Sequence, residues 1–92
     1  MIRTVHHKGL KRFIELDDRS KLPPEMVERI RGILTALADA ERIEELDLPG
    51  YRLHALKGDL KGYFAVTVRA NWRIIFRFED GDAFDVDFKD YH

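Results

Sequence analysis

The feature that most constrains the fold of this sequence is the alternation of apolar and polar residues in its second half. In the stretch YFAVTV, residues 63–68, every second side chain is apolar and large, and WRIIFRF and AFDVDF repeat the same period further on. A period of two residues is typical of β-strands with one packed face. The sequence therefore predicts three consecutive strands of an antiparallel sheet.

The alternation also assigns side chains to the two faces of this sheet. The apolar set predicted to face the core comprises Phe64, Val66, Val68, Trp72, Ile74, Phe76, Phe78, Phe84, Val86 and Phe88. The set predicted to face outward comprises Tyr63, Ala65, Thr67, Arg73, Ile75, Arg77, Asp85 and Asp87. The outward face is therefore expected to be open and rich in cations and polar groups.

The turn EDGD between the last two strands allows two registers. A two-residue loop, Asp80-Gly81, would set Phe84 opposite Arg77 and mix apolar with charged faces. A three-residue loop, residues 80–82, pairs Ile74 with Phe88 and sets Arg77 opposite Asp85. Because a slip of one residue inverts every side chain, burial favours the three-residue loop. In that register Arg73 shares a face with Lys89 and Tyr91.

The first half of the chain has helical periodicity. KGLKRFIEL, residues 8–16, carries apolar residues at helical spacing, and prolines follow it. Pro24 suits the first turn of a second helix that extends to about Ala40, with an apolar stripe that runs from Met26 to Ala38. MIRTV at the start is predicted to be an edge strand, and RLHAL, residues 52–56, a short strand.

Together these elements predict an α+β fold in which two N-terminal helices pack on one face of an antiparallel sheet. The 92 residues are expected to form one domain, 1–92. The sequence has no cysteine, no signal-peptide pattern and no apolar run long enough to span a membrane, which fits a cytoplasmic protein.

The net charge of −1 conceals an uneven distribution along the chain. Between residues 51 and 77 the basic residues Arg52, Lys57, Lys61, Arg69, Arg73 and Arg77 stand against a single acidic residue, Asp59. Such a segment can form a basic patch for a polyanion, although scattered surface charge explains it about as well.

Three stretches resemble the HigB toxins of bacterial toxin–antitoxin pairs, which belong to the RelE-like group. They are RLHALKGDLKGYFAVTV, NWRIIFRFEDGDAFDV and the closing DYH. The resemblance is clearest from about Pro49 to His92. The chain departs from the pattern at Tyr51, where a small polar residue is expected before the arginine, and around Arg69-Ala70.

The resemblance implies a RelE-like microbial ribonuclease fold and a ribosome-dependent mRNA endonuclease that cuts messages in the ribosomal A site. It implies as partners the 70S ribosome with mRNA and a HigA-like helix-turn-helix antitoxin, through which alone the protein would meet DNA. By their match to the family motif, the catalytic group would be His54, Asp90, Tyr91 and His92, with Lys57 and Arg73 as basic contacts.

The same residues suit a metal-free, cofactor-free reaction in which the 2′-OH of RNA attacks the adjacent phosphate. That reaction needs a base, cations for the phosphate charge and an acid for the leaving 5′ oxygen. We assign His92 as the acid, either Asp90 or His54 as the base, and Tyr91 as a stacking platform. Arg73 and Lys57 would stabilise charge, and Lys61 and Arg69 would grip nucleic acid.

Other interpretations of these residues are structural. A lone histidine such as His54 is more often packed or solvated than catalytic, and Arg77 opposite Asp85 is expected to be an ordinary cross-strand pair. His6-His7 are expected to start a helix rather than bind a metal. As a whole, the chain could also be a non-catalytic RNA- or protein-binding module of the same fold. The complete set of two histidines and an acid favours the nuclease.

Overall fold

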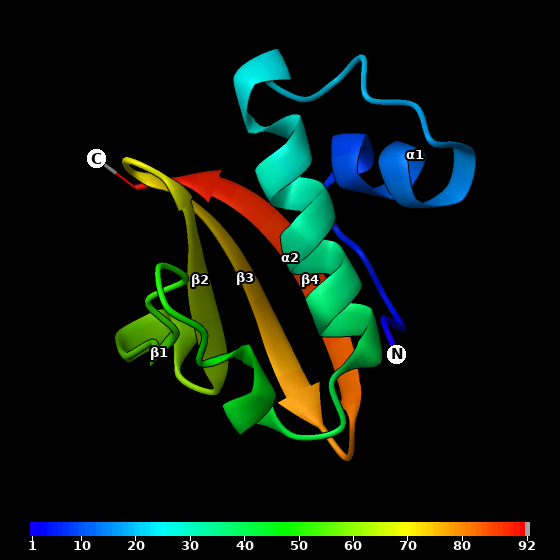
Figure 1. Cartoon of the computed structure of the whole chain (residues 1–92). Coiled ribbons are helices and arrows are strands. Elements are labelled where there is room, and N and C mark those ends of the chain that lie inside the picture. Colours follow the sequence, from blue (N-terminus) through cyan, green and yellow to red (C-terminus); the bar gives the residue numbers. More distant parts are fainter. Residues whose placement is uncertain (92) are drawn as a thin grey trace.

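The structure, a computed structural model, describes residues 1–91. Two helices come first, α1 (Lys8–Leu16) and α2 (Val27–Asp39), and a four-stranded sheet follows (Figure 1). The strands are β1 (His54–Ala55), β2 (Tyr63–Arg69), β3 (Trp72–Glu79) and β4 (Asp82–Asp90). They lie in sequence order, and each neighbouring pair is antiparallel. Short 3₁₀ turns occupy Pro24–Met26, Ile43–Leu46 and Gly58–Leu60. Among residues 1–91, no helix has the length and apolar character that crossing a bilayer requires.

The helix boundaries follow from local chemistry. His7 caps α1, because its Nδ1 accepts a hydrogen bond from the Leu10 backbone N–H at 3.2 Å, as expected for a helix-start histidine. Asp17, in the left-handed conformation with φ of 55°, ends the same helix. Pro24 opens the 3₁₀ turn that leads into α2, where its missing N–H costs nothing.

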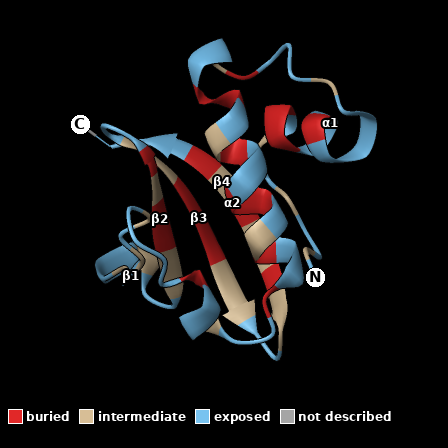
Figure 2. Cartoon of the chain, viewed as in Figure 1, coloured by how far each residue is buried: buried red, intermediate tan, exposed pale blue. Residues whose placement is uncertain are grey.

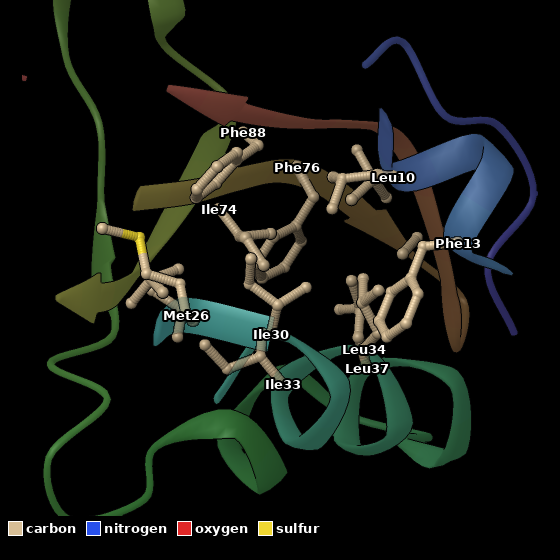
Figure 3. Packing of buried hydrophobic residues seen from close by; sticks show 14 of the residues in the cluster. Leu10, Phe13, Met26, Ile30, Ile33, Leu34, Leu37, Ile74, Phe76 and Phe88 are labelled. Atoms are coloured by element: carbon tan, nitrogen blue, oxygen red, sulfur yellow. The ribbon is translucent and has the colours of Figure 1, made fainter. Parts of the chain in front are cut away.

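The hydrophobic core lies between α2 and the sheet. α2 crosses one face of the sheet, and its buried residues form a single cluster with the apolar residues of β2, β3 and β4 (Figures 2 and 3). Ile30, Ile33 and Leu37 of α2 are fully buried, and so are Val66, Ile74, Phe76 and Val86 of the strands. Leu10 and Phe13 of α1 join this cluster. Ala38, expected at the end of the α2 stripe, is exposed, and Ala40 is buried instead.

The predicted register of the last hairpin was wrong at the turn and right beyond it. Asp80 and Gly81 form a two-residue loop with φ values of 50° and 81°, and Glu79 pairs with Asp82. Positive φ at both positions is the requirement of a type I′ turn, for which Asp-Gly is a preferred sequence. Turn chemistry therefore decided the loop length, and Phe84 faces Arg77 on the side away from α2.

A β-bulge at Asp85 then restores the predicted pairing. Ile75 pairs with Asp87 and Ile74 with Phe88, while Arg77 pairs with Phe84, so β4 holds one extra residue over this interval. That residue is Asp85, with φ of 56°. The bulge returns Val86 and Phe88 to the core, where burial requires them.

The N-terminal segment lies along β4 but is not a continuous strand. Ile2 and Val5 form isolated parallel bridges with Ala83 and Val86, on either side of the bulge. Their backbone hydrogen bonds include Arg3 N to Ala83 O and His6 N to Val86 O, both at 2.8 Å. The bulge interrupts the ladder and explains why the predicted edge strand is broken.

The face of the sheet away from α2, which we call the open face, carries three rows of aligned residues, of which the row Tyr63, Arg77 and Phe84 lies nearest the β3–β4 turn. The second row is His54, Ala65, Ile75 and Asp87, and the third is Thr67, Arg73 and Lys89. Ala65 and Ile75 are buried, although the alternation predicted them to face outward to solvent. Both lie on inner strands, where side chains of the neighbouring strands surround them.

Candidate active site

Arg73 lies in the middle of the third row of the open face, between Thr67 of β2 and Lys89 of β4. Its Nη1 donates to the carbonyl of Ala70 at 2.6 Å and to that of Trp72 at 3.3 Å. Ala70 lies in the turn between β2 and β3, and Trp72 is the first residue of β3. Because one nitrogen makes both bonds, they leave the Nε–Nη2 edge of the guanidinium, its two-point fork, for an anion.

The end of β4 is attached to the same turn. Asp90 pairs with Trp72, and the backbone N–H of Tyr91 donates to the carbonyl of Asn71 at 2.8 Å. Figure 1 shows the end of β4, in red, beside the yellow turn between β2 and β3. Tyr91 is held by its backbone while the residue stays 36% exposed, so its ring is available to a ligand.

The structure brings some of the predicted site residues together and separates others. Arg73 and Tyr91 each donate a hydrogen bond to the β2–β3 turn, to Ala70 O and Asn71 O. Arg73 and Lys89 are direct partners in the ladder, as predicted. Asp90 is opposite Trp72, so strand alternation directs it to the other side of the sheet from Arg73. His92 lies outside the described residues.

His54 occupies the far end of the open face, on the edge strand β1. It is exposed and pairs with Ala65, so β2 lies between it and Arg73. The Cα atoms of His54 and Arg73 are separated by two strand spacings across the sheet and by two residues along the strands. These separations put them roughly 12 Å apart. The two residues would therefore act on a ligand from two sides.

The contact of His54 with its own loop defines its tautomer. Its Nδ1 lies 2.9 Å from the carbonyl oxygen of Arg52. A carbonyl oxygen can only accept a hydrogen bond, so the neutral ring carries its proton on Nδ1. Nε2 then keeps a free lone pair and can accept a proton.

The remaining predicted basic residues surround this face. Lys57 precedes the 3₁₀ turn Gly58–Leu60, Lys61 follows it, and Arg69 ends β2. All three are exposed. They are free to contact a polyanion along the β1–β2 connection and the β2–β3 turn.

Arg77, in contrast, is engaged within the protein. Its Nε donates to Oδ2 of Asp85 at 2.8 Å, and its guanidinium lies 5.4 Å from the ring centre of Phe84. The hydrogen bond from Arg77 lowers the pKa of Asp85, and the same bond raises the pKa of Arg77. The prediction of an Arg77–Asp85 pair is confirmed, although the two residues are not ladder partners.

Two residues near the site were absent from the sequence-based assignment. Thr67 is the ladder partner of Arg73, and its Oγ1 is buried without a hydrogen-bond partner among the described residues. Arg29 of α2 donates from Nη2 to the carbonyl of Thr67 at 3.3 Å. Neither residue belongs to a recognisable motif, and only the pairing of distant segments reveals them.

The fold is that of RelE-like toxins with known structures. YafQ from E. coli strain BL21(DE3) superposes with a TM-score of 0.65 at 20% identity, over 98% of this chain and 91% of that one. The toxin–antitoxin complex YoeB-YefM from Staphylococcus aureus gives a TM-score of 0.64 at 21% identity, over 100% and 95% of the two chains. At this identity, the likeness establishes the fold alone.

Sequence similarity identifies the family. Residues 3–92 match the HigB-like toxin family, described as the RelE-like toxin of the type II toxin-antitoxin system HigB. The chain is 48% identical to Endoribonuclease HigB of Proteus vulgaris over 92 residues, the full length of both proteins. It is 37% identical to Toxin HigB-1 of Vibrio cholerae over 79 residues, 83% of this chain and 82% of that protein. This protein therefore belongs to the HigB-like toxin family.

Proposed function

We propose that this protein is an endoribonuclease toxin that cuts mRNA in the A site of the translating ribosome. Membership of the HigB-like family and the name of the Proteus vulgaris relative support the activity class. Action on messages in the ribosome is the proposed refinement.

The observation that carries this proposal is the hydrogen bond from Tyr91 N to Asn71 O. It holds Tyr91, directly after β4, at the turn beside which Arg73 is fixed by the carbonyls of Ala70 and Trp72. A phosphate at this turn could meet a guanidinium fork, an aromatic ring and, in the ladder beside Arg73, the ammonium of Lys89. This combination suits an RNA backbone together with its bases.

In the proposed reaction, the 2′ oxygen forms a bond to the adjacent phosphorus, and the bond from phosphorus to the 5′ oxygen breaks. A base takes the proton of the 2′-OH, and an acid gives a proton to the leaving 5′ oxygen. The products are a 2′,3′-cyclic phosphate and a free 5′-OH. Arg73 and Lys57 would stabilise the charge that develops on the phosphate oxygens.

Of the two bases considered, His54 suits the role better than Asp90. Its Nε2 is unprotonated in the neutral ring and lies on an exposed residue of the open face. Asp90 alternates to the other side of the sheet from Arg73. His92 remains the proposed acid, on the match of DYH to the family motif.

As a toxin of this class, the protein would be held inactive by a cognate antitoxin. We propose a HigA-like antitoxin with a helix-turn-helix, which would be the protein's only connection to DNA. Support comes from the family description and from the YoeB-YefM complex, whose toxin shares this fold. Action on translating ribosomes would put the protein in the cytoplasm.

The test is induction of this chain alone in bacteria, together with mapping of message ends in a translating extract. We expect growth arrest and cuts within codons of translated messages, but no cuts in the same RNA without ribosomes. Arg73→Ala and His92→Ala should each restore growth while the protein stays folded by circular dichroism. Intact messages and normal growth with wild type would favour a non-catalytic binding module, and a toxic, folded double variant would refute the site.

A further inference from the structure

Arg29, in the first turn of α2, joins the helix to two segments that flank the open face. Its Nη2 donates to the carbonyl of Gly50 at 2.6 Å and to that of Thr67 at 3.3 Å. Its guanidinium carbon lies 4.7 Å from the centre of the Tyr51 ring. A planar cation can stack on a ring and donate from its edge at the same time, whereas an ammonium group has no plane to stack and no edge of fixed geometry.

The segment that Arg29 holds has an unusual backbone. Gly50 has φ of 87°, and Arg52, which is not a glycine, has φ of 52°. Between them, the carbonyl of Tyr51 accepts a hydrogen bond from Thr67 N at 2.7 Å. A non-glycine residue in the left-handed region costs free energy, and it persists where the surroundings fix it. Here Arg29 and Thr67 hold the residues directly before Arg52.

This segment in turn determines the orientation of His54. The acceptor for the Nδ1 proton of His54 is the carbonyl of Arg52, two residues earlier. The direction of that carbonyl depends on the backbone angles that Arg29 helps to hold. A continuous series of contacts thus leads from Arg29 through Gly50 and Tyr51 to the imidazole.

The position of Arg29 leaves one of its donors without a partner in residues 1–91. Its Nε is buried without an acceptor among the described residues. A buried donor that lacks a partner destabilises the folded state.

We propose that Arg29 is a positioning residue: by holding residues 50–52, it keeps the neutral His54 ring in the tautomer with its proton on Nδ1. The catalytic consequence rests on the proposed function, because only there does Nε2 accept the proton of the 2′-OH. The structural consequence does not, since the tautomer can be measured without RNA.

The first experiment is long-range ¹H–¹⁵N NMR of the histidine rings at about pH 8.5, two units above the reference histidine pKa. The protein contains an internal reference of the opposite tautomer. His7 accepts from Leu10 N through Nδ1, so its neutral ring carries the proton on Nε2. His54 is assigned by the loss of its signal in His54→Gln.

Arg29→Met should shift the ¹⁵N pattern of His54 toward that of His7. The matched control is Arg31→Met on the same helix. Arg31 also lies over an aromatic ring, 4.8 Å from the centre of Phe13, but it pairs with Asp17 rather than with the loop before β1. Arg29→Lys keeps the charge without the stacked fork and should shift His54 in the same direction. It also serves if Arg29→Met does not fold.

The second experiment measures cleavage of ribosome-bound message. In Arg29→Lys, kcat should fall roughly ten- to a hundredfold, as expected for a displaced catalytic group, with KM within about twofold of wild type. Arg31→Met should cleave at the wild-type rate.

The outcomes separate the two proposals. An unchanged His54 tautomer in folded Arg29 variants, or equal shifts in Arg29→Met and Arg31→Met, would overturn the role of Arg29. A tautomer shift in a protein that never cleaves RNA would support the positioning role and refute the nuclease. A shift without loss of kcat in an active nuclease would overturn the catalytic consequence.

Discussion

Arg77 binds the carboxylate of Asp85 at 2.8 Å, yet its ladder partner across β3 and β4 is Phe84. The bulge makes both contacts possible, because the extra residue turns out of the ladder and its side chain reaches back to the guanidinium. Asp85 also accepts from Thr4 Oγ1 at 3.3 Å, and its Oδ1 lies 3.0 Å from His6 Nε2. One carboxylate therefore joins the N-terminal segment to the two last strands.

Replacing Asp85 with asparagine should destabilise the protein in a pH-dependent way. The hydrogen bond from Arg77 lowers the pKa of Asp85 in the folded state. The stabilisation of the folded protein by the Asp85 carboxylate is therefore present above the unfolded pKa of about 3.9. It is lost as the pH falls through the pKa of Asp85 in the folded state. At neutral pH we expect Asp85→Asn to reduce the free energy of unfolding by about 1–2 kcal/mol. Urea unfolding of wild type and Asp85→Asn from pH 7 to pH 2 measures this difference in the free energy of unfolding.

A double-mutant cycle with Arg77→Met supplies the control. At neutral pH, the double variant should lose less free energy of unfolding than the sum of the losses in the two single variants. This difference, the coupling between Asp85 and Arg77, should vanish in acid. A coupling that persists at pH 2, or a wild-type advantage that is independent of pH, would show that the charge of Asp85 contributes little.

The register of this hairpin was predictable from the sequence in part. Burial required Ile74 to pair with Phe88, and the structure agrees. The preference of Asp80-Gly81 for a type I′ turn required a shorter loop, and the structure agrees with that as well. The two requirements conflict in a regular ladder, and the bulge at Asp85 reconciles them. A bulge has no pattern of its own, so periodicity could not reveal it.

The candidate site likewise contains contacts that the sequence predicts and contacts that it does not. The partnership of Arg73 with Lys89 and the place of Tyr91 near it follow from pairing of adjacent strands, which alternation predicts. The contacts of Arg29 connect residues 21 and 38 positions apart in the sequence. No local pattern records such contacts, because they depend on how α2 lies on the sheet.

Arg73→Lys should lose most RNA cleavage although it keeps the positive charge. An ammonium can replace the bonds to the carbonyls of Ala70 and Trp72 or bind a phosphate, but it cannot present a second, rigid edge while doing so. We expect the cleavage rate in a translating extract to fall about a hundredfold, comparable to loss of one preorganised donor.

Arg69→Lys is the comparison for this change. Arg69 is exposed at the end of β2, near the same turn, and is proposed to grip nucleic acid through its charge alone. Replacing Arg69 with lysine should therefore lower the cleavage rate by less than about threefold. Equal losses in the two variants would mean that Arg73 also acts only as a charge.

Tyr91 distinguishes a stacking role from a hydrogen-bonding role. Its backbone N–H binds Asn71 O and does not depend on the side chain, so substitutions should leave the end of β4 in place. If the ring stacks on a base, Tyr91→Phe should cleave near the wild-type rate. Tyr91→Ala should weaken binding to the ribosome–message complex by about 1–3 kcal/mol, the value of one stacked base. Equal and severe losses of kcat in both variants would instead assign the phenol hydroxyl to the chemistry. Binding is measured separately from cleavage by titrating the ribosome–message complex with the catalytically inactive variant Arg73→Ala, with and without each Tyr91 change.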